Sequence, residues 1–237
     1  MTNVSSGYDC SKCPALKESL FCNLDDSALA KISSQKTCNT YKKGQIVFHE
    51  GNRPLGLYCL RSGKVKIFKT GIDRREQIVR LATPGDIIGY RSFLGEDSYT
   101  ATAASLDDSL ICFIDKDDFY GVLKEDSRLS LNIIKLLTTQ LRTAEELLRD
   151  MAQKSVRERL AEVLLLLRNK FGTDKADSGV LNAKLSREEL ASFVGTATET
   201  LIRLLSDFKA EQVIETRGKH IKILDPKALM RIANLQN

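Results

Sequence analysis

The C-terminal half of the fold is decided by the stretch KLSREELASFVGTATETLIRLLSDF, residues 184–208. A Ser-x-x-Glu capping box begins at Ser186, which is typical of a helix N-terminus. Gly195 then supplies a turn, and a second box, Thr-x-x-Glu, begins at Thr196. Two helices joined by a tight glycine turn predict a helix-turn-helix.

The second of these helices has two different faces. Its apolar side chains recur at helical spacing and are predicted to face the core: Leu201, Leu204, Leu205 and Phe208. The opposite face, near the helix start, carries Thr198, Glu199, Ile202 and Arg203, where a recognition helix meets base edges in the major groove. Arginine can bond bidentately to guanine and a carboxylate can accept from cytosine, so Glu199 and Arg203 can read a G·C pair. The alternative is that Glu199 only caps its helix and Arg203 is a solvated surface charge.

A hairpin with a basic tip follows the two helices. Residues 212–216 and 220–224 are expected to form two short strands on either side of Arg217-Gly218-Lys219. Arg217 and Lys219 at its tip are predicted to contact phosphates, which would position the domain without reading sequence. Together with the helices, this hairpin predicts a winged helix-turn-helix that binds DNA.

Upstream, short apolar or alternating runs separated by glycine-bearing turns recur from Gly44 to Ile114. They are residues 45–48, 57–60, 64–68, 77–81 and 109–114. This pattern predicts a small antiparallel β-roll or barrel, which makes the chain an α+β protein.

After Asp115 the apolar period changes from two to about 3.6 residues, which predicts a long helix over residues 126–154. A second copy of the same helix is an economical cover for its apolar stripe, giving a homodimer with a parallel two-fold coiled coil. The residues predicted at that interface are Ile133, Leu137, Ala144, Leu148 and Met151. The alternative is a helix packed wholly within its own chain. A further helix is expected over residues 156–170.

The strands from Gly44 to Ile114, the long helix and the 198–205 segment TETLIRLL together resemble the CRP/FNR family of bacterial transcription regulators. The resemblance covers nearly the whole chain. It implies a cyclic-nucleotide-binding-like roll, a dimerisation helix and a winged helix-turn-helix that reads a two-fold operator in double-stranded DNA, with RNA polymerase as a further partner. It also places Glu199 and Arg203 at the family's base-reading positions, whereas Ile202 departs from the serine of FNR-type members.

The implied organisation has four parts. They are a cysteine-rich segment (1–24), the β-roll sensor (25–125), the dimerisation helix (126–154) and the DNA-binding domain (155–237).

Composition fits a soluble DNA-binding protein of the cytoplasm. There are 36 Lys and Arg against 31 Asp and Glu, a net charge of +5, which is compatible with nucleic-acid binding but does not argue for it alone. No apolar run is long enough to span a membrane, and the N-terminus lacks the regions of a signal peptide. No phosphate-binding glycine loop or hydrolase motif is present, so we expect a protein that is not an enzyme.

The cysteines carry the sensor prediction. Cys10, Cys13 and Cys22 lie in a polar segment ahead of the roll, and Cys112 lies in its last strand. Because cytosolic thiols are kept reduced, such a set favours metal or redox chemistry over structural disulfides. FNR-type members have a similar N-terminal cluster and a distant fourth cysteine, which implies a [4Fe–4S] cluster on these four residues, although the gap from Cys13 to Cys22 is longer here.

Other uses of the thiols stay open: zinc on the same four ligands, reversible thiol oxidation, or no cofactor. Cys38 and Cys59 are predicted to be ordinary thiols.

Cyclic-nucleotide binding is not expected. In family members that bind it, a glutamate holds the ribose and an arginine holds the phosphate; here Tyr90 and Tyr99 stand at those places. We therefore predict a regulator whose dimerisation and DNA affinity respond to oxygen or redox state. One alternative is a regulator without a cluster that binds a small effector, such as a nucleotide, in the roll. The other is a redox or metal-binding protein whose C-terminal domain binds proteins.

Overall fold

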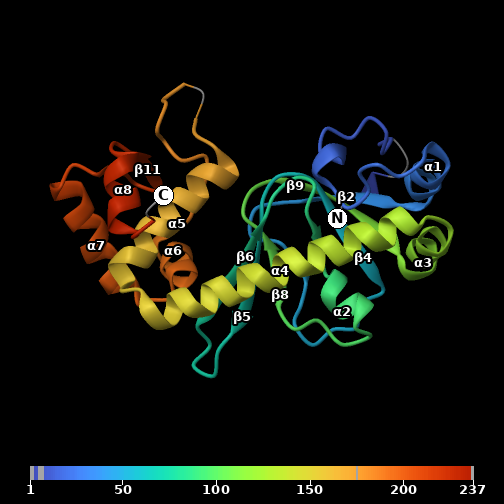
Figure 1. Ribbon diagram of the computed structural model, residues 1–237, viewed down its shortest axis with the longest axis horizontal. Helices are drawn as coiled ribbons and strands as arrows, with labels where there is room; N and C mark the ends of the chain where they lie inside the picture. Colours follow the sequence, from blue (N-terminus) through green and yellow to red (C-terminus); the bar gives the residue numbers. More distant parts are fainter. Residues whose placement is uncertain (1–2, 5–7, 175, 236–237) are drawn as a thin grey trace. The chain divides into compact units, whose positions relative to one another are not determined.

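The computed structural model describes residues 3–4, 8–174 and 176–235, and the chain divides into two units (Figure 1). The first comprises Met1–Thr70 and Val79–Arg142, and the second comprises Gly71–Ile78 and Thr143–Asn237. The helix predicted at 126–154 is α4 (Ser127–Gln153), and it contributes residues to both units. Residues 1–2 and 5–7 of the predicted cysteine-rich segment lie outside the described residues.

Two sheets form the roll, as the strand pattern predicted. One has the order β1-β2-β9-β4-β7 and consists of β1 (Asn3–Val4), β2 (Thr37–Tyr41), β9 (Ser109–Asp115), β4 (Gly56–Ser62) and β7 (Ile87–Ile88). The other has the order β3-β8-β5-β6 and consists of β3 (Ile46–Phe48), β8 (Thr102–Ser105), β5 (Val65–Thr70) and β6 (Glu76–Ala82).

The roll begins earlier than its apolar pattern indicated, because β2 precedes Gly44. This strand buries Cys38 and Tyr41 but carries polar residues between them, so it lacks the apolar alternation of a typical strand. It pairs antiparallel with β9, with Cys38 directly opposite Cys112.

Helices cover one end of the first unit and extend its core. They are η1 (Leu16–Glu18), α1 (Asp26–Gln35), α2 (Tyr90–Leu94) and α3 (Lys116–Glu125), together with the first part of α4. Leu20 and Phe21 are buried among them, 7% and 5% exposed, in the core cluster that includes Ile133 of α4. The cysteine-rich segment is therefore not merely a polar extension of the roll, because its own apolar side chains anchor it.

The second unit contains the expected winged helix-turn-helix. Its elements are α5 (Val156–Phe171), α6 (Arg187–Val194), α7 (Thr198–Ala210), β10 (Ile214–Arg217), β11 (His220–Ile223) and α8 (Pro226–Ile232). The capping box at Ser186 is present: its hydroxyl accepts from the N–H of Glu189, whose carboxylate accepts from the N–H of Ser186.

The second predicted capping box, at Thr196, is wrong. The N-cap of α7 is Ala197, which offers no side-chain oxygen to the helix. The N–H of Thr196 instead donates to the carbonyl of Ala191, which makes Thr196 part of the turn that ends α6. The Thr-x-x-Glu spacing was right for a cap, but the helix begins one residue later than that spacing requires.

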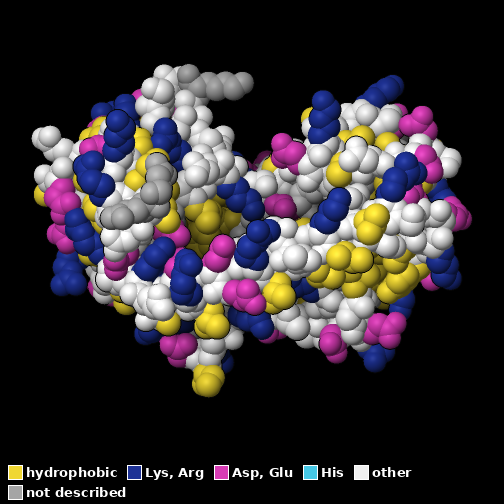
Figure 2. Space-filling model, in the orientation of Figure 1, with side chains coloured by type: hydrophobic (Ala, Val, Ile, Leu, Met, Phe, Trp, Pro, Cys, Tyr) yellow, Lys and Arg dark blue, Asp and Glu magenta, His cyan; other side chains and the backbone are white. Residues whose placement is uncertain are grey.

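The apolar residues of α4 divide between two faces. Ile133 is 8% exposed and packs in the core of its own unit, so its prediction as a dimer-interface residue is wrong. Five exposed apolar residues of α4 form what we call the α4 stripe, namely Ile134, Leu137, Leu141, Ala144 and Leu148; Leu131 and Leu147 are exposed as well. Figure 2 shows hydrophobic side chains gathered over the part of α4 that belongs to the first unit. The residues of the α4 stripe are spaced alternately three and four residues apart, as in a coiled-coil seam.

Met151 continues that spacing but is half-buried, and the end of its side chain lies close to Gly195. It therefore packs within the second unit. Among the helices that the structure describes, none is both long enough and apolar enough to cross a membrane.

Candidate functional sites

The face of α7 predicted to read DNA is accessible. Glu199, Ile202 and Arg203 are exposed and Thr198 is partly exposed, while Leu201, Leu204, Leu205 and Phe208 are buried on the other side. Glu199 and Arg203 lie one helical turn apart, and Ile202 between them is 49% exposed. This arrangement leaves a carboxylate, a guanidinium and an apolar surface free to meet base edges in a major groove.

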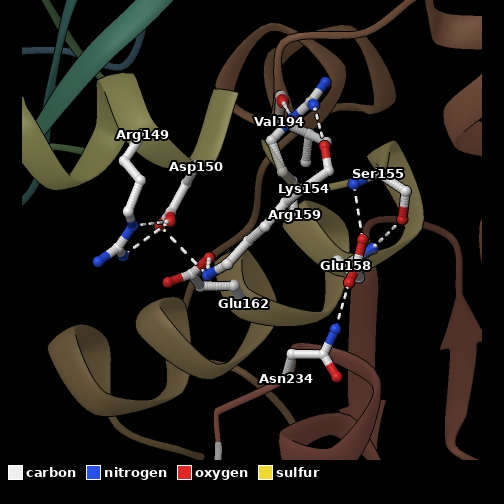
Figure 3. Close-up of polar contacts among 9 residues, drawn as sticks. All are labelled: Arg149, Asp150, Lys154, Ser155, Glu158, Arg159, Glu162, Val194 and Asn234. Atoms are coloured by element: carbon white, nitrogen blue, oxygen red, sulfur yellow. Dashed lines mark hydrogen bonds and ion pairs between the residues drawn. The ribbon is translucent and has the colours of Figure 1, made fainter. Parts of the chain in front are cut away.

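The turn between α6 and α7 is held by an arginine from α5, as the close-up in Figure 3 shows. The Arg159 guanidinium donates to the carbonyl oxygens of Val194 (3.1 Å), Gly195 (3.1 Å) and Lys154 (2.8 Å). Gly195 adopts a left-handed conformation, φ 74°, which favours glycine at a helix C-terminus. Arg159 thus joins the helix-turn-helix to the segment between α4 and α5.

A buried carboxylate lies on the other side of that segment. Asp150, at the end of α4, is 7% exposed and accepts from Arg149 (2.8 Å) and from the ammonium of Lys154, 3.2 Å away. Lys154 also pairs with Glu162 of α5 at 2.6 Å. Burial alone would raise the pKa of Asp150, but its hydrogen bonds from Arg149 and Lys154 outweigh burial and lower the pKa below its ordinary value.

The wing carries its basic residues at an exposed tip. Arg217 and Lys219 are both exposed, and Arg217 is paired with Glu215 of the same strand at 2.9 Å. Arg187, at the start of α6, donates to the carbonyl of Gly218 (3.0 Å), which ties the wing tip to the helix-turn-helix. An exposed basic tip is suited to contacts with DNA phosphates.

A second site lies in the first unit, where one apolar pocket brings cysteines together. Its lining includes Cys10 and Cys13 from the N-terminal segment, Cys59 from β4 and Cys112 from β9. Burial raises the pKa of the Cys59 thiol, and so does the proximity of Cys10 and Cys13. Cys59 was predicted to be an ordinary thiol, and its place beside the other cysteines follows from a strand pairing that the sequence does not reveal.

A buried lysine lines the same pocket. Lys36 is 9% exposed, and its ammonium donates to the carbonyl oxygens of Tyr8 and Ser33. The Ser33 hydroxyl in turn accepts from the N–H of Cys10 at 3.0 Å. Lys36 thus fastens the cysteine segment to α1 and places a positive charge near the thiols.

Cys22 lines a different pocket from Cys10 and Cys13, although its neighbour Phe21 lines theirs. Asn132 of α4 holds this part of the segment: its amide donates to the carbonyl oxygens of Leu20 (3.0 Å) and Cys22 (3.1 Å). No pattern in the sequence indicated this link, which connects the cysteine segment to the helix that carries the α4 stripe.

Cys112 is bonded to Cys38, with 4.0 Å between their Cα atoms. The prediction of Cys38 as an ordinary thiol is therefore wrong, and the sulfur of Cys112, which was predicted as a cluster ligand, is occupied by the disulfide in this state. The physical reason is the antiparallel pairing of β2 and β9, which sets the two residues opposite each other. The thiols around the pocket are soft donors of the kind that iron–sulfur clusters require, so the residue types fit. In this disulfide-bonded state, no group of three or more His, Cys, Asp or Glu in the described part of the chain is arranged to hold a metal ion.

Tyr90 and Tyr99, which replace the expected nucleotide-binding charges, lie in the core. Tyr90 is 1% exposed, and Tyr99 is 5% exposed and stacks on Phe48 with ring centroids 4.0 Å apart. Arg91 is exposed and donates to Gln140 at 3.0 Å. Aromatic rings thus occupy the two positions where charged groups would meet a cyclic nucleotide.

A β-roll, a long helix with an exposed apolar stripe and a winged helix-turn-helix with an accessible recognition helix define a DNA-binding transcription regulator. Two family descriptions match the chain: "Cyclic nucleotide-binding domain" at residues 38–126 and "Crp-like helix-turn-helix domain" at residues 158–232. The chain belongs to the CRP/FNR family of transcription regulators.

The chain is similar to named transcription regulators from several bacteria. The chain is 29% identical to the CRP-like cAMP-activated global transcriptional regulator of Mycobacterium tuberculosis, over 90% of this chain and 96% of that one. It is 27% identical to the transcriptional activator protein Anr of Pseudomonas protegens, over 98% and 93%. The fold is similar to that of FixK2 from Bradyrhizobium japonicum, with a TM-score of 0.74, 22% identity and coverage of 83% and 96%.

Proposed function

We propose that this regulator responds to oxygen through a [4Fe–4S] cluster held by Cys10, Cys13, Cys22 and Cys112. The observation that carries the proposal is the shared pocket: two cysteines of the N-terminal segment and one from β9 line the same apolar surface. Cys22 is one residue beyond Phe21, which also lines it, so a local backbone change suffices to bring its thiol there. The chain is also 27% identical to the fumarate and nitrate reduction regulatory protein of Vibrio cholerae, over 82% of this chain and 77% of that one.

Charge also supports the proposal. Four thiolates crowded into an apolar pocket would repel one another and lose hydration, which costs free energy. The buried ammonium of Lys36 offsets part of that cost, because it lines the same pocket. When bound, a cluster of this type supplies reactivity towards oxygen and nitric oxide.

The chain's own residues would connect the pocket to dimerisation. Thiolates held together keep the segment against the roll, and Asn132 then grips the carbonyl oxygens of Leu20 and Cys22 from α4. Release of the segment removes these bonds and the packing of Leu20 and Phe21 on the buried side of α4. A helix that loses its support presents the α4 stripe less well to a partner copy. A monomer grips one half-site only, so affinity for a two-fold operator falls steeply.

The cluster is tested by purifying the full chain without oxygen and measuring iron and acid-labile sulfide. We expect about four of each per chain in the wild type and a large loss in Cys112→Ser. Cys22→Ser and Cys59→Ser form a matched pair that identifies the remaining ligand; we expect iron loss in the first alone. Equal iron in wild type and Cys112→Ser would remove Cys112 from the ligand set, and an iron-free wild type would overturn the proposal.

Oxygen response is tested on DNA. Duplexes selected from a random pool without oxygen should be retained by the wild-type protein and released after exposure to air. Retention that is equal in both conditions argues for a regulator that senses something else. Contact with RNA polymerase, which the family resemblance implies, stays a prediction.

A further inference from the structure

Three of the six cysteines form a row across the first sheet. Cys38 of β2 is opposite Cys112 of β9, and Cys112 is opposite Cys59 of β4. Directly opposed residues of neighbouring strands direct their side chains to the same face of a sheet. Cys112 is therefore flanked by a thiol on each side, and it also lines the pocket with Cys10 and Cys13.

The two neighbours of Cys112 are not equivalent. In an antiparallel sheet, a residue forms a close, non-hydrogen-bonded pair with one neighbouring strand and a wider, hydrogen-bonded pair with the other. The Cα atoms of Cys38 and Cys112 are 4.0 Å apart, which assigns the close pair to Cys38. Cys59 then lies at the wider position, and it is a free cysteine in the structure. Sheet geometry thus selects Cys38 as the disulfide partner of Cys112.

We propose that Cys38 and Cys112 form a reversible disulfide whose oxidised state makes the Cys112 sulfur unavailable as a cluster ligand. This inference rests on the proposed function, because it concerns one of the proposed cluster ligands. A metal takes a thiolate, and a sulfur already bonded to another sulfur offers none. Bonding to Cys38 and ligation of iron are therefore mutually exclusive at Cys112, and the ratio of the two states sets how much of the protein can load a cluster.

The chemistry is thiol–disulfide exchange with a low-molecular-weight disulfide as the oxidant. The thiolate of one cysteine attacks a sulfur of that disulfide, forming a mixed disulfide and expelling one small thiolate. The thiolate of the second cysteine attacks the mixed disulfide at the protein sulfur, so the Cys38–Cys112 bond forms and a second small thiolate leaves. In total, two protein thiols are oxidised and one small disulfide is reduced to two thiols. A dithiol reverses the reaction by becoming a disulfide itself.

Access limits the rate of this exchange. Cys38 and Cys112 are 3% and 5% exposed, while Cys10 and Cys13, which cover the same pocket, are partly exposed. A reagent must therefore enter through the cysteine segment. Exchange should therefore be fastest when that segment moves away from the roll.

The test compares full-length protein kept reduced with protein treated with glutathione disulfide, both without oxygen. In one sample, free thiols are alkylated after unfolding and mapped by mass spectrometry. In a second sample, which is neither unfolded nor alkylated, iron uptake from ferrous iron and sulfide is measured. The variants are Cys38→Ser, with Cys38→Ala as a second version suited to a buried site, and Cys59→Ser as the matched control on the other side of the row.

In the oxidised wild type we expect Cys38 and Cys112 to lose labelling together while Cys59 keeps it, and iron uptake to be lost until a dithiol is added. Both Cys38 variants should keep Cys112 labelled and take up iron after the same treatment. Cys59→Ser should retain the paired protection. The reversible disulfide alone is overturned if Cys38 and Cys112 are labelled independently of each other, or if iron uptake is unaffected when both are protected from labelling. Absence of iron in the reduced wild type overturns the proposed function itself, and with it the proposal that the disulfide controls cluster loading.

Discussion

The guanidinium of Arg159 donates a hydrogen bond to the carbonyl oxygen of Gly195 at 3.1 Å, which joins the first turn of α5 to the turn of the helix-turn-helix. The same side chain reaches the carbonyls of Val194 and Lys154, so one residue satisfies three backbone acceptors. Bonds from a charged donor are stronger than neutral ones, and a fork of N–H groups is something only arginine supplies. The angle at which α7 is presented depends on this contact.

Replacing Arg159 by Met should therefore lower both stability and DNA affinity. We expect a loss of about 2–3 kcal/mol in the free energy of unfolding, because partly buried carbonyls lose their charged donor. Urea denaturation and operator titration measure the two effects. Arg159→Lys should recover only part of each loss, and Lys209→Met, an exposed position on α7, should be close to neutral. Wild-type affinity in Arg159→Met would show that the turn is positioned by other contacts.

Arg203 and Arg217 should differ in how they affect DNA binding. Arg203 lies on the exposed face of α7, so Arg203→Ala should cost about 1–3 kcal/mol and relax preference at one base pair. Arg217 lies at the wing tip, so Arg217→Ala should weaken all sequences alike and reduce the slope of log affinity against log salt by about 0.9. Selection from random duplexes measures the change in base preference, and salt titrations measure the change in slope. A uniform loss in Arg203→Ala would reduce that residue to a phosphate contact.

Local signals made the helix-turn-helix predictable from the sequence, and their absence explains the errors elsewhere. A capping box and a C-terminal glycine act within a few residues, so Ser186 and Gly195 could be recognised directly. The start of α7 was predicted one residue too early, because Thr196 is a residue type that often caps helices but does not occupy the N-cap position here. The pairing of Cys38 with Cys112 depends on the register of strands that are distant in sequence, and no local pattern encodes it.

Helix α4 shows a different limit of sequence-based prediction. A broad apolar stripe at a period of 3.6 residues contains both the face that packs on its own chain and the face that is left exposed. Ile133 and Ile134 are adjacent in sequence, yet the first is 8% and the second 58% exposed. Which of the two is buried depends on where the roll packs against α4, and the sequence does not reveal this. Ile133 was therefore assigned to the wrong face.

Substitutions on the two faces of α4 should consequently separate stability from dimerisation. Ile133→Ala removes buried methyl groups and should lower the free energy of unfolding by about 2–5 kcal/mol. Leu141→Lys, at a side chain 61% exposed, should leave the fold intact but weaken association by placing a charge in the coiled-coil seam. Chemical denaturation and analytical ultracentrifugation measure the two effects. An unchanged dimer in Leu141→Lys would mean that the α4 stripe is not the interface.

Asp150 should give stability a dependence on acid pH. Its pKa in the folded chain is lowered from the ordinary 3.8 because the bonds from Arg149 and Lys154 outweigh burial. The unfolded chain therefore takes up a proton first, so the stabilisation is complete well above pH 3.8 and is lost as pH falls through the lower, folded pKa. Asp150→Asn should cost about 1–2 kcal/mol at pH 7 and progressively less towards pH 3. Thermal unfolding of both proteins from pH 7 to pH 3 measures this loss of stability. A loss that does not become smaller towards pH 3 would mean that Asp150 acts through packing and not through its charge.

Asn132 should control how firmly the cysteine segment is held. Its amide bridges the carbonyls of Leu20 and Cys22, and Asn132→Ala leaves both without their donor at a cost of about 1–2 kcal/mol. Because Leu20 and Phe21 remain apolar and buried, we expect local opening of the segment and not global unfolding. Amide hydrogen exchange over residues 16–23 should accelerate in the variant while exchange in β4 and β9 stays slow.

The matched control for this prediction is Thr138→Ala, because the Thr138 hydroxyl bonds only within its own helix, to the carbonyl of Ile134 at 2.8 Å. That variant should leave exchange of residues 16–23 unchanged. In dimerisation assays without oxygen, Asn132→Ala should weaken self-association even though the α4 stripe itself is intact, since the helix has lost its contact on the buried side. Faster exchange with wild-type association would show that the segment opens without affecting the dimer, and the cysteine pocket would then need another route to the DNA-binding domain.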